Sequence, residues 1–254
     1  MAEAADHSVP ARFAEDAGGE RFAKDAGGRR PADDPIPAGD AYDHETGPAS
    51  ARRLHVVAAD DVPATGFTVF LDRDGVFNMH PPVAVRHWRE FHWLPGARDA
   101  FARLNRPDVR TCLCTNQPTV GLLLSTPSMI RRVNSRLQTE LEAAGGDLHH
   151  VEAAFAPTWL RHRRRKPRPG MLEDGAAWLT GHGWQVDKAR AVMVGDKPKD
   201  AMAGNAFGVP AILLATTHDE SYLSEAIARH GLDAVVASGL PAAVEIILER
   251  IEKA

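Results

Sequence analysis

The stretch Phe67-Thr68-Val69-Phe70-Leu71-Asp72-Arg73-Asp74-Gly75 decides the fold of this chain. Its first five residues form a short, largely apolar run that ends abruptly at Asp72, a pattern typical of a strand buried inside a sheet. Short apolar runs of the same kind recur at 109–114, 151–155, 191–194 and 210–214. The sequence therefore predicts a series of buried strands, each well separated from the next.

Helical patterns fill the intervals between these strands. Over 127–143, apolar residues recur every three or four positions, as they do on one face of an amphipathic helix. Further helices are predicted to open at Pro169 and to cover 219–229 and 241–252. Because strands that alternate with helices join through right-handed crossovers, we expect a Rossmann-like, three-layer α/β/α fold with a mostly parallel sheet.

Composition divides the chain into two unequal parts. Residues 1–64 are rich in Ala, Gly, Asp and Pro and contain 13 acidic and 7 basic residues, a net charge of −6, whereas the whole chain of 254 residues carries −4. Such a segment buries too little apolar area to offset the entropy of ordering it. We therefore predict a disordered acidic tail over 1–64 and a folded domain over 65–254.

Location and redox state follow from simple sequence features. No apolar stretch reaches 18 residues, and the first residues lack the basic and apolar regions of a signal peptide. We expect a soluble, cytoplasmic, monomeric protein without membrane contact. Cys112 and Cys114 lie two apart in a predicted strand, which favours buried thiols on one face over a disulfide.

Polar residues gather where the predicted strands end. Ligands of such sheets bind beyond the carboxyl ends of the strands, so chemistry is expected at these positions. Asp72 and Asp74 follow the first strand, and Thr115 and Asn116 follow the second. The other polar residues at comparable positions are Lys166, before the helix at Pro169, and Asp196, Lys197 and Asp200, after the strand at 191–194.

These residue types suit the transfer of a phosphoryl group. A carboxylate such as Asp72 attacks phosphorus and forms an acyl phosphate. Asp74 points the same way in an extended chain and can exchange protons with the leaving group and with water. Carboxylates around a phosphate require a cation, for which we expect Mg²⁺ bound by Asp72, Asp196 and the backbone carbonyl of Asp74. Lys166 adds positive charge, and Thr115 offers a hydroxyl to a phosphoryl oxygen.

Five blocks of sequence, taken in order, resemble one known family. They are Phe70-Leu71-Asp72-Arg73-Asp74-Gly75-Val76-Phe77-Asn78, Leu94-Pro95-Gly96, Thr115-Asn116-Gln117-Pro118, Arg165-Lys166-Pro167-Arg168-Pro169-Gly170-Met171-Leu172 and Val194-Gly195-Asp196-Lys197-Pro198-Lys199-Asp200. The chain resembles the haloacid dehalogenase (HAD) superfamily of phosphatases, subfamily IIIA, in the branch of heptose bisphosphate and histidinol-phosphate phosphatases. A lone Asp-x-Asp-Gly is a weak signal, but five ordered blocks are specific.

The resemblance implies a role for each matching residue. It implies Asp72 as the nucleophile, Asp74 as the acid and base, and Asp72, Asp74 and Asp196 as magnesium ligands. It also implies phosphate contacts from Thr115 and Lys166. We add Asn116 to the substrate-binding residues and place Lys197 and Asp200 in supporting roles. The spacing leaves no room for a cap domain after Asp74 or after Thr115, so a capless phosphatase domain is expected.

Two segments depart from the pattern of these relatives. The relatives often carry a cysteine-rich zinc loop before the Arg-Lys-Pro block, but residues 156–164 contain no cysteine, so we predict no zinc. They also often carry an arginine-containing segment after Thr-Asn-Gln, whereas residues 119–124 here contain no arginine. Both departures touch loops that select the substrate and leave the predicted catalytic residues intact.

A dense basic run, residues 161–168, stands where the zinc loop is missing. Most charge runs are solvated surface, but Lys166 ties this one to the predicted site. Arg165 is our best candidate for binding a second anionic group of the substrate. The sequence thus favours a small phosphorylated metabolite such as a sugar (bis)phosphate. The alternatives are histidinol phosphate, the 3′-phosphate of a nucleic-acid end, which is less favoured, and least of all a fold without catalysis that serves binding.

Overall fold

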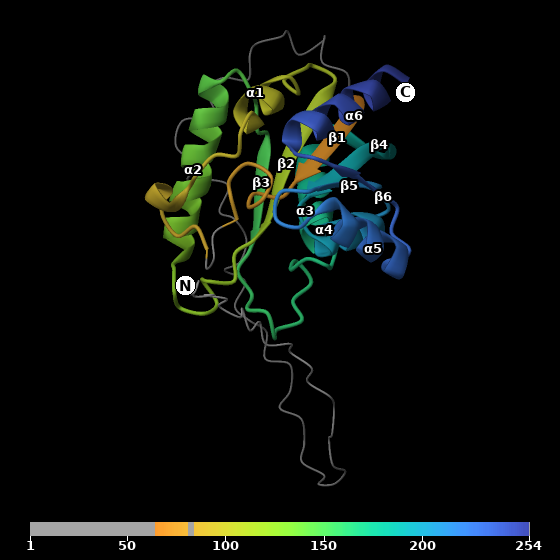
Figure 1. The fold of residues 1–254 in the computed structure, drawn as a ribbon. Coiled ribbons are helices and arrows are strands. Elements are labelled where there is room, and N and C mark those ends of the chain that lie inside the picture. Colours follow the sequence, from red (N-terminus) through yellow and green to blue (C-terminus); the bar gives the residue numbers. More distant parts are fainter. Residues whose placement is uncertain (1–63, 81–83, 254) are drawn as a thin grey trace, which may run out of the picture. The chain divides into compact units, whose positions relative to one another are not determined.

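The computed structural model describes residues 64–80 and 84–253. Six parallel strands form one sheet in the order β3-β2-β1-β4-β5-β6 (Figure 1). The strands are β1 Thr65–Leu71, β2 Val109–Asn116, β3 His150–Ala154, β4 Gln185–Gly195, β5 Ala211–Leu214 and β6 Ala234–Ala237. The chain winds outward from β1 to β3 and then crosses to the other side of β1. The strand order therefore reverses between β1 and β4, where open parallel sheets bind their ligands.

Helices cover both faces of this sheet. On one face lie α1 Ala97–Ala102, α2 Pro127–Ala143 and α6 Leu240–Lys253. On the other lie α3 Gly170–Gly181, α4 Pro198–Phe207 and α5 Glu220–His230. A short 3₁₀ turn, η2 Trp88–Glu90, packs near α2. The arrangement is the three-layer α/β/α fold that the sequence predicts.

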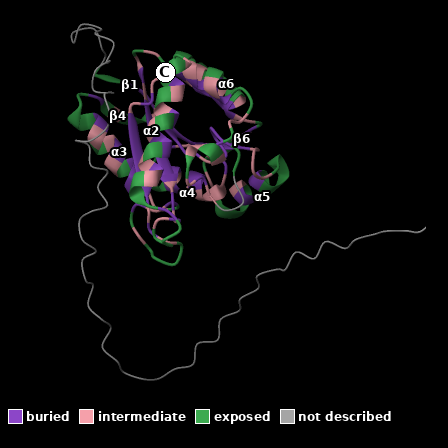
Figure 2. Ribbon diagram, turned by 90° about the vertical axis from the view of Figure 1, so that its left-hand side faces the viewer, coloured by how far each residue is buried: buried purple, intermediate pink, exposed green. Residues whose placement is uncertain are grey.

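Alternation along β1 divides the core between the two faces. Val69 and Leu71 belong to the buried cluster under α1, α2 and α6, and Phe70 belongs to the cluster under α3, α4 and α5. The Phe70 ring meets Phe207 of α4 edge to face, with ring centroids 5.6 Å apart. Figure 2 shows buried segments, in purple, along the strands and on parts of the helices. Because both faces of β1 are fully packed, the position of Asp72 at its end is fixed.

Several expectations from the sequence can be compared with the structure. Cys112 and Cys114 are both buried, and their sulfur atoms lie 3.9 Å apart without a disulfide. Among the described residues, η2 is the one helical turn between β1 and α1, and α2 lies between β2 and β3, which agrees with a capless fold. In the described part of the chain, no helix has the length and apolar character of a membrane span. The acidic tail predicted for residues 1–64 lies outside the described residues, apart from Ala64.

His149, just before β3, links the stability of this fold to pH. Its Nδ1 accepts a hydrogen bond of 3.2 Å from the backbone N–H of Thr111. Burial lowers the pKa of His149 to about 4, the nearby Asp147 acting in the opposite direction. Because the folded state binds a proton less readily than the unfolded state, its stability falls as the pH drops below the unfolded pKa of about 6.5.

We expect acidification from pH 7 to pH 4 to destabilise the wild type by about 3 kcal/mol more than the His149→Asn variant. The Asn Oδ1 stands near the position of Nδ1 and keeps the acceptor without titrating. Denaturant unfolding of both proteins at several pH values measures this difference. A constant difference in the free energy of unfolding across this range would contradict the assignment.

Candidate active site

Asp72 is the first residue beyond β1, at the reversal point of the sheet. Its backbone N–H donates to the carbonyl of Val194 in β4 at 2.8 Å, so the residue is tied to both central strands. One carboxylate oxygen accepts a hydrogen bond from the backbone N–H of Arg73 at 2.8 Å. The other lies 3.0 Å from the ammonium of Lys166. The predicted nucleophile is thus buried and held in a defined orientation.

Three buried acidic residues meet at this point. One carboxylate oxygen from each of Asp72, Asp196 and Asp200 lies within 4.8 Å of the other two. Asp196 follows β4, and Asp200 stands in the first turn of α4, where it accepts the backbone N–H of Lys197 at 3.0 Å. The sequence placed Asp196 among the metal ligands and Asp200 in a supporting role, and the structure brings both beside Asp72.

Burial and close spacing both disfavour the charged forms of the carboxylates in this acidic cluster. Burial and the neighbouring carboxylates of Asp200 and Asp72 raise the pKa of Asp196 to about 7. Burial also raises the pKa of Asp72, although Lys166 acts in the opposite direction. Such shifts are typical of carboxylates grouped where a cation or a reacting group is bound.

Lys166 is the buried cation that faces this cluster. Its ammonium lies 2.7 Å from Asp200 and 3.0 Å from Asp72. Burial disfavours the charged form, but the two carboxylates outweigh that cost and raise the pKa of Lys166. Lys166 therefore stays protonated over the whole range of working pH.

Asp74 is held by four hydrogen bonds from three neighbours. The Arg73 guanidinium donates to both carboxylate oxygens at 3.1 Å, Asn78 donates at 3.0 Å and Gln117 at 3.1 Å. Burial acts to raise the pKa of Asp74, but the Arg73 charge and these bonds lower it overall. Asp74 is therefore a carboxylate in this structure, the form that accepts a proton.

Thr115 and Asn116, predicted to follow the second strand, are the last two residues of β2. Thr115 is buried, and its hydroxyl accepts a hydrogen bond of 2.9 Å from Gln117. The Asn116 carboxamide bonds to the backbone of Lys166 in both directions, each bond 3.1 Å long. Asn116, predicted as a substrate-binding residue, here fixes the backbone that carries Lys166.

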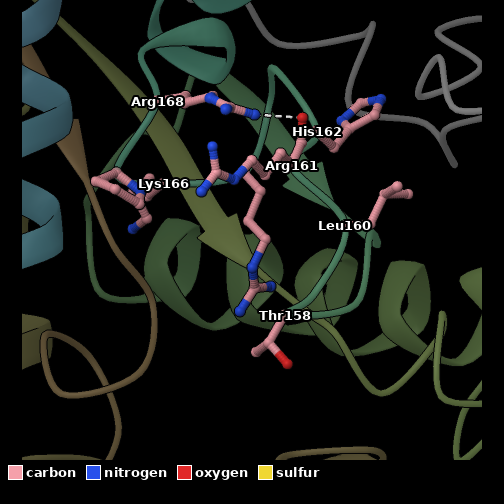
Figure 3. Close-up of a pocket in the computed structure, with 8 residues that line it drawn as sticks. Thr158, Leu160, Arg161, His162, Lys166 and Arg168 are labelled. Carbon is pink, nitrogen blue, oxygen red and sulfur yellow. Dashed lines mark hydrogen bonds between the residues drawn. The ribbon is translucent and has the colours of Figure 1, made fainter. Parts of the chain in front are cut away.

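A basic hollow of about 230 Å³ lies next to Lys166 (Figure 3). Its lining residues are Thr158, Leu160, Arg161, His162, Arg165, Lys166, Pro167 and Arg168. Arg165 donates to the carbonyl of Ala156 at 3.1 Å, and burial lowers the pKa of its guanidinium. Arg168 donates to the carbonyl of Arg161, which closes the loop on itself. Arg165 thus lines a cationic space that adjoins the predicted phosphate-binding lysine.

Lys197 contacts a histidine through its side chain. Its ammonium lies 2.7 Å from Nε2 of His80. Burial, with Lys197 next in importance, lowers the pKa of His80, so the ring is neutral and can accept a hydrogen bond from the ammonium. The supporting role predicted for Lys197 stays a prediction.

Sequence reasoning did not assign roles to several residues that shape the site. Gln117 joins Asp74 to Thr115. Thr217 donates to Asp196 and Thr216 to the carbonyl of Gly75, each at 2.5 Å. Thr216 and Thr217 lie just beyond the carboxyl end of β5. The expectation that ligands bind beyond the carboxyl ends of the strands, which identified the aspartates, therefore also covers these threonines.

Gly75 has a conformation and a location that exclude a side chain. Its φ is +82°, and a Cβ atom at this position would come within 2.3 Å of the Asp196 carboxylate. The glycine of the Asp-x-Asp-Gly block therefore lets the turn after β1 approach the acid that follows β4.

Comparisons with known proteins agree with this geometry. Residues 163–240 match a family described as HAD-hydrolase-like. The chain is 31% identical to the D-glycero-beta-D-manno-heptose-1,7-bisphosphate 7-phosphatase of Rhodopseudomonas palustris over 56% of this chain and 79% of that protein. It is 30% identical to the D-glycero-D-manno-heptose-1,7-bisphosphate 7-phosphatase of Chlorobaculum tepidum over 62% and 82%, respectively.

A solved structure gives the same result. The D,D-heptose 1,7-bisphosphate phosphatase of B. bronchiseptica, complexed with magnesium and phosphate, superposes with a TM-score of 0.64 and 28% identity. The match covers 72% of this chain and 98% of that one. The chain therefore belongs to the HAD-like phosphatases, in the branch that contains the heptose bisphosphate phosphatases, and it is a phosphatase.

Proposed function

We propose that the protein is a Mg²⁺-dependent phosphomonoester hydrolase that forms an aspartyl phosphate on Asp72 and acts on a small sugar bisphosphate. The observation that carries the proposal is the buried group of Asp72, Asp196, Asp200 and Lys166 at the reversal point of the sheet. It combines a fixed carboxylate nucleophile with a cation for phosphoryl oxygens and further carboxylates for a metal.

The donor set fits a hard divalent cation. Mg²⁺ prefers oxygen ligands, and Asp72 and Asp196 offer carboxylate oxygens close together. The backbone carbonyl of Asp74 is the third proposed ligand. Asp200 lies near enough to contribute charge, while it also forms an ion pair with Lys166 and accepts a hydrogen bond from the Lys197 backbone N–H. Bound there, Mg²⁺ would neutralise charge on the phosphoryl oxygens and let the dianion approach the carboxylates.

The first step transfers the phosphoryl group to the protein. A carboxylate oxygen of Asp72 forms a bond to phosphorus, and the bond between phosphorus and the substrate oxygen breaks. Lys166 and the Thr115 hydroxyl stabilise the phosphoryl oxygens. Asp74 gives its proton to the departing alcohol, which requires that substrate binding replaces some of the bonds that now hold it as a carboxylate.

The second step releases phosphate. A water oxygen attacks phosphorus, the bond between phosphorus and Asp72 breaks, and Asp74 takes the proton from the water. Asp74 already stands in its proton-accepting form with a lowered pKa, so the observed hydrogen bonds suit this step. The products of the cycle are inorganic phosphate and a free alcohol. Asp74 is left protonated, as the first step of the next turnover requires.

The bisphosphate substrate is supported by two observations. The relatives reported above are named heptose-1,7-bisphosphate 7-phosphatases. The basic hollow beside Lys166 offers Arg165 and its neighbours to a second anionic group, and arginine binds phosphate in a bidentate manner.

A substrate panel tests the proposal. The purified protein is assayed with an aryl phosphate, heptose 1,7-bisphosphate, histidinol phosphate and a 3′-phosphorylated oligonucleotide, with and without Mg²⁺. We expect the highest kcat/KM for the bisphosphate. The Arg165→Met variant should raise KM for the bisphosphate and not for the aryl phosphate, while Arg229→Met, an exposed change on α5, alters neither. A higher kcat/KM for the oligonucleotide than for the bisphosphate would overturn the proposed substrate class. If none of the four substrates is hydrolysed, the proposed reaction is overturned.

Metal binding should also stabilise the fold. Because a ligand that binds only the folded state stabilises it by mass action, Mg²⁺ at 100 times its Kd is expected to raise the free energy of unfolding by about 2.7 kcal/mol. Thermal unfolding in EDTA and in excess Mg²⁺ measures the effect, and activity lost in EDTA should return with Mg²⁺. The Asp196→Asn variant should lose most of the rise in Tm. Equal Tm values for wild type in the two buffers would contradict a metal site here.

A further inference from the structure

Glu152 is a buried carboxylate that takes no part in the reaction proposed above. It stands in the middle of β3, paired in register with Cys114 of β2, and its side chain is 5% exposed. A buried, charged side chain is costly unless it is paired, so its presence in a strand of the core calls for a specific partner.

Glu152 has two partners, one at each of its carboxylate oxygens. One carboxylate oxygen lies 2.8 Å from Nε2 of His150, and the other is bonded to the Arg164 guanidinium. Arg164 is itself buried and also pairs with Asp174 of α3 at 3.1 Å. Burial acts to raise the pKa of Glu152, but the His150 bond and the Arg164 charge lower it overall. The carboxylate is therefore charged and joins β3 to the loop that holds Arg164.

Helix α3 contacts both partners of Glu152, His150 and Arg164. The His150 ring stacks on Trp178 with centroids 4.2 Å apart, and Trp178 stacks on His182 at 3.7 Å. Asp174 binds Arg164 and also Arg163, the latter at 2.6 Å. The Glu152 group therefore involves both β3 and α3, while Arg164 belongs to the loop that connects them.

The loop that Arg164 holds is the one that presents the phosphate-binding cations. Arg165 and Lys166 follow Arg164 directly, and Lys166 reaches Asp72 at 3.0 Å. From the other side, Asn116 bonds both the N–H and the carbonyl of Lys166. This segment is therefore held at two points, Arg164 by Glu152 of β3 and Lys166 by Asn116 of β2.

We infer that Glu152 and Arg164 form an ionic anchor that positions Arg165 and Lys166 for phosphate binding, an inference that rests on the function proposed above. Movement of the loop away from Asp72 pulls Arg164 out of its pair and leaves a buried carboxylate without its cation. That cost keeps the loop in place. Because a displacement of about 1 Å in a binding group can cost about 100-fold in rate, the anchor affects turnover without touching the substrate.

Phosphate binding separates the anchor from a purely stabilising role. We measure the Kd of inorganic phosphate in excess Mg²⁺ by calorimetry, together with kcat and KM for an aryl phosphate, on the full chain. Glu152→Gln keeps the shape of the side chain and removes its charge. It should raise the phosphate Kd about tenfold and lower kcat/KM about 100-fold. Arg164→Lys keeps the charge and loses the guanidinium fork, so its effects should be intermediate.

Ile247→Ala is the matched control, because Ile247 is a buried residue of α6 on the other face of the sheet. It should lower stability by leaving a cavity and change neither the phosphate Kd nor kcat/KM at temperatures well below Tm. The anchor is overturned if Glu152→Gln behaves like this control. If Glu152→Gln does not fold, Arg164→Lys decides, and a phosphate Kd equal to that of wild type overturns the anchor. Inactivity of the wild type toward every phosphomonoester would instead overturn the proposed function.

Discussion

Replacement of Asp72 by asparagine is expected to lower kcat by about 10⁴-fold or more while the protein stays folded. The Asn carboxamide is nearly isosteric with the carboxylate but does not attack phosphorus. The hydrogen bond from the Asp72 backbone N–H to Val194 is unaffected by the change, and the pair between Lys166 and Asp200 is still formed. Loss of activity should therefore reflect chemistry and not unfolding.

Two measurements check this result. Initial rates with an aryl phosphate in Mg²⁺ give kcat, and circular dichroism with thermal unfolding tests the fold. Asp99→Asn, an exposed change in the first turn of α1, is the control and should keep wild-type rates. Acid-quenched wild type should carry phosphate on the peptide that contains Asp72. Turnover by Asp72→Asn near the wild-type rate would remove Asp72 from the nucleophile role.

Replacement of Lys166 by methionine has the next largest expected effect, and it acts on stability as well as on rate. The ammonium lies within 3.0 Å of two buried carboxylates, and Asp196 is close to both. Breaking a buried ion pair by removing one partner typically costs about 3–5 kcal/mol, because the remaining charge stays buried. The rate should fall about 10³-fold, since a positioned cation for the phosphoryl oxygens is lost.

A double variant separates the two effects of Lys166. Urea unfolding in EDTA measures the stability of wild type, Lys166→Met and Lys166→Met with Asp200→Asn. The double variant should recover part of the lost stability, because one of the carboxylates that repel one another becomes neutral. Its activity should not recover. Equal stability of Lys166→Met and wild type would show that Lys166 does not offset the buried acids.

Apolar patterns predict the elements that bury large side chains, both the one-sided helix α2 and the strand β1, which is packed on both faces. Helix α2 covers Pro127–Ala143, the range predicted from its apolar spacing, and its buried residues include Ile130, Val133 and Leu137. Strand β1 is likewise predicted from its apolar run. In both elements, the residues that pack against the core are large, so the pattern stands out from its surroundings.

Helices α4 and α1 and strand β6 are not predicted from the sequence, because each is short or buries mainly small residues. Helix α4 buries mostly small residues, including Ala201, Ala203 and Gly204, so it has no stripe of large apolar side chains. Helix α1 has six residues, and β6 has four, of which one is buried. Short or small-residue elements depend on their neighbours for stability, and a single sequence does not display those neighbours.

The site residues also divide into those that the sequence predicts and those whose contacts it does not predict. Strand ends and motif spacing mark Asp72, Lys166 and Asp196, and the structure brings these three together. They also mark Thr115, whose hydroxyl is joined to Asp74 through Gln117. The contacts of Glu152, Gln117 and Thr217 were not found, because they depend on side chains from distant segments that meet only after folding. Asn116 was placed correctly at a strand end, but its bonds to the Lys166 backbone require the loop geometry.

The reversal of strand order between β1 and β4 also determines how the centre is shared along the chain. Asp72, Asp74, Thr115 and Lys166 come before the turn at Gly181–Gly183, and Asp196 and Asp200 come after it. The amino-terminal half thus brings the proposed nucleophile and the buried cation, and the carboxyl-terminal half completes the acidic cluster. Neither half contains all of these residues, so a fragment that ends at Gly183 would lack both Asp196 and Asp200.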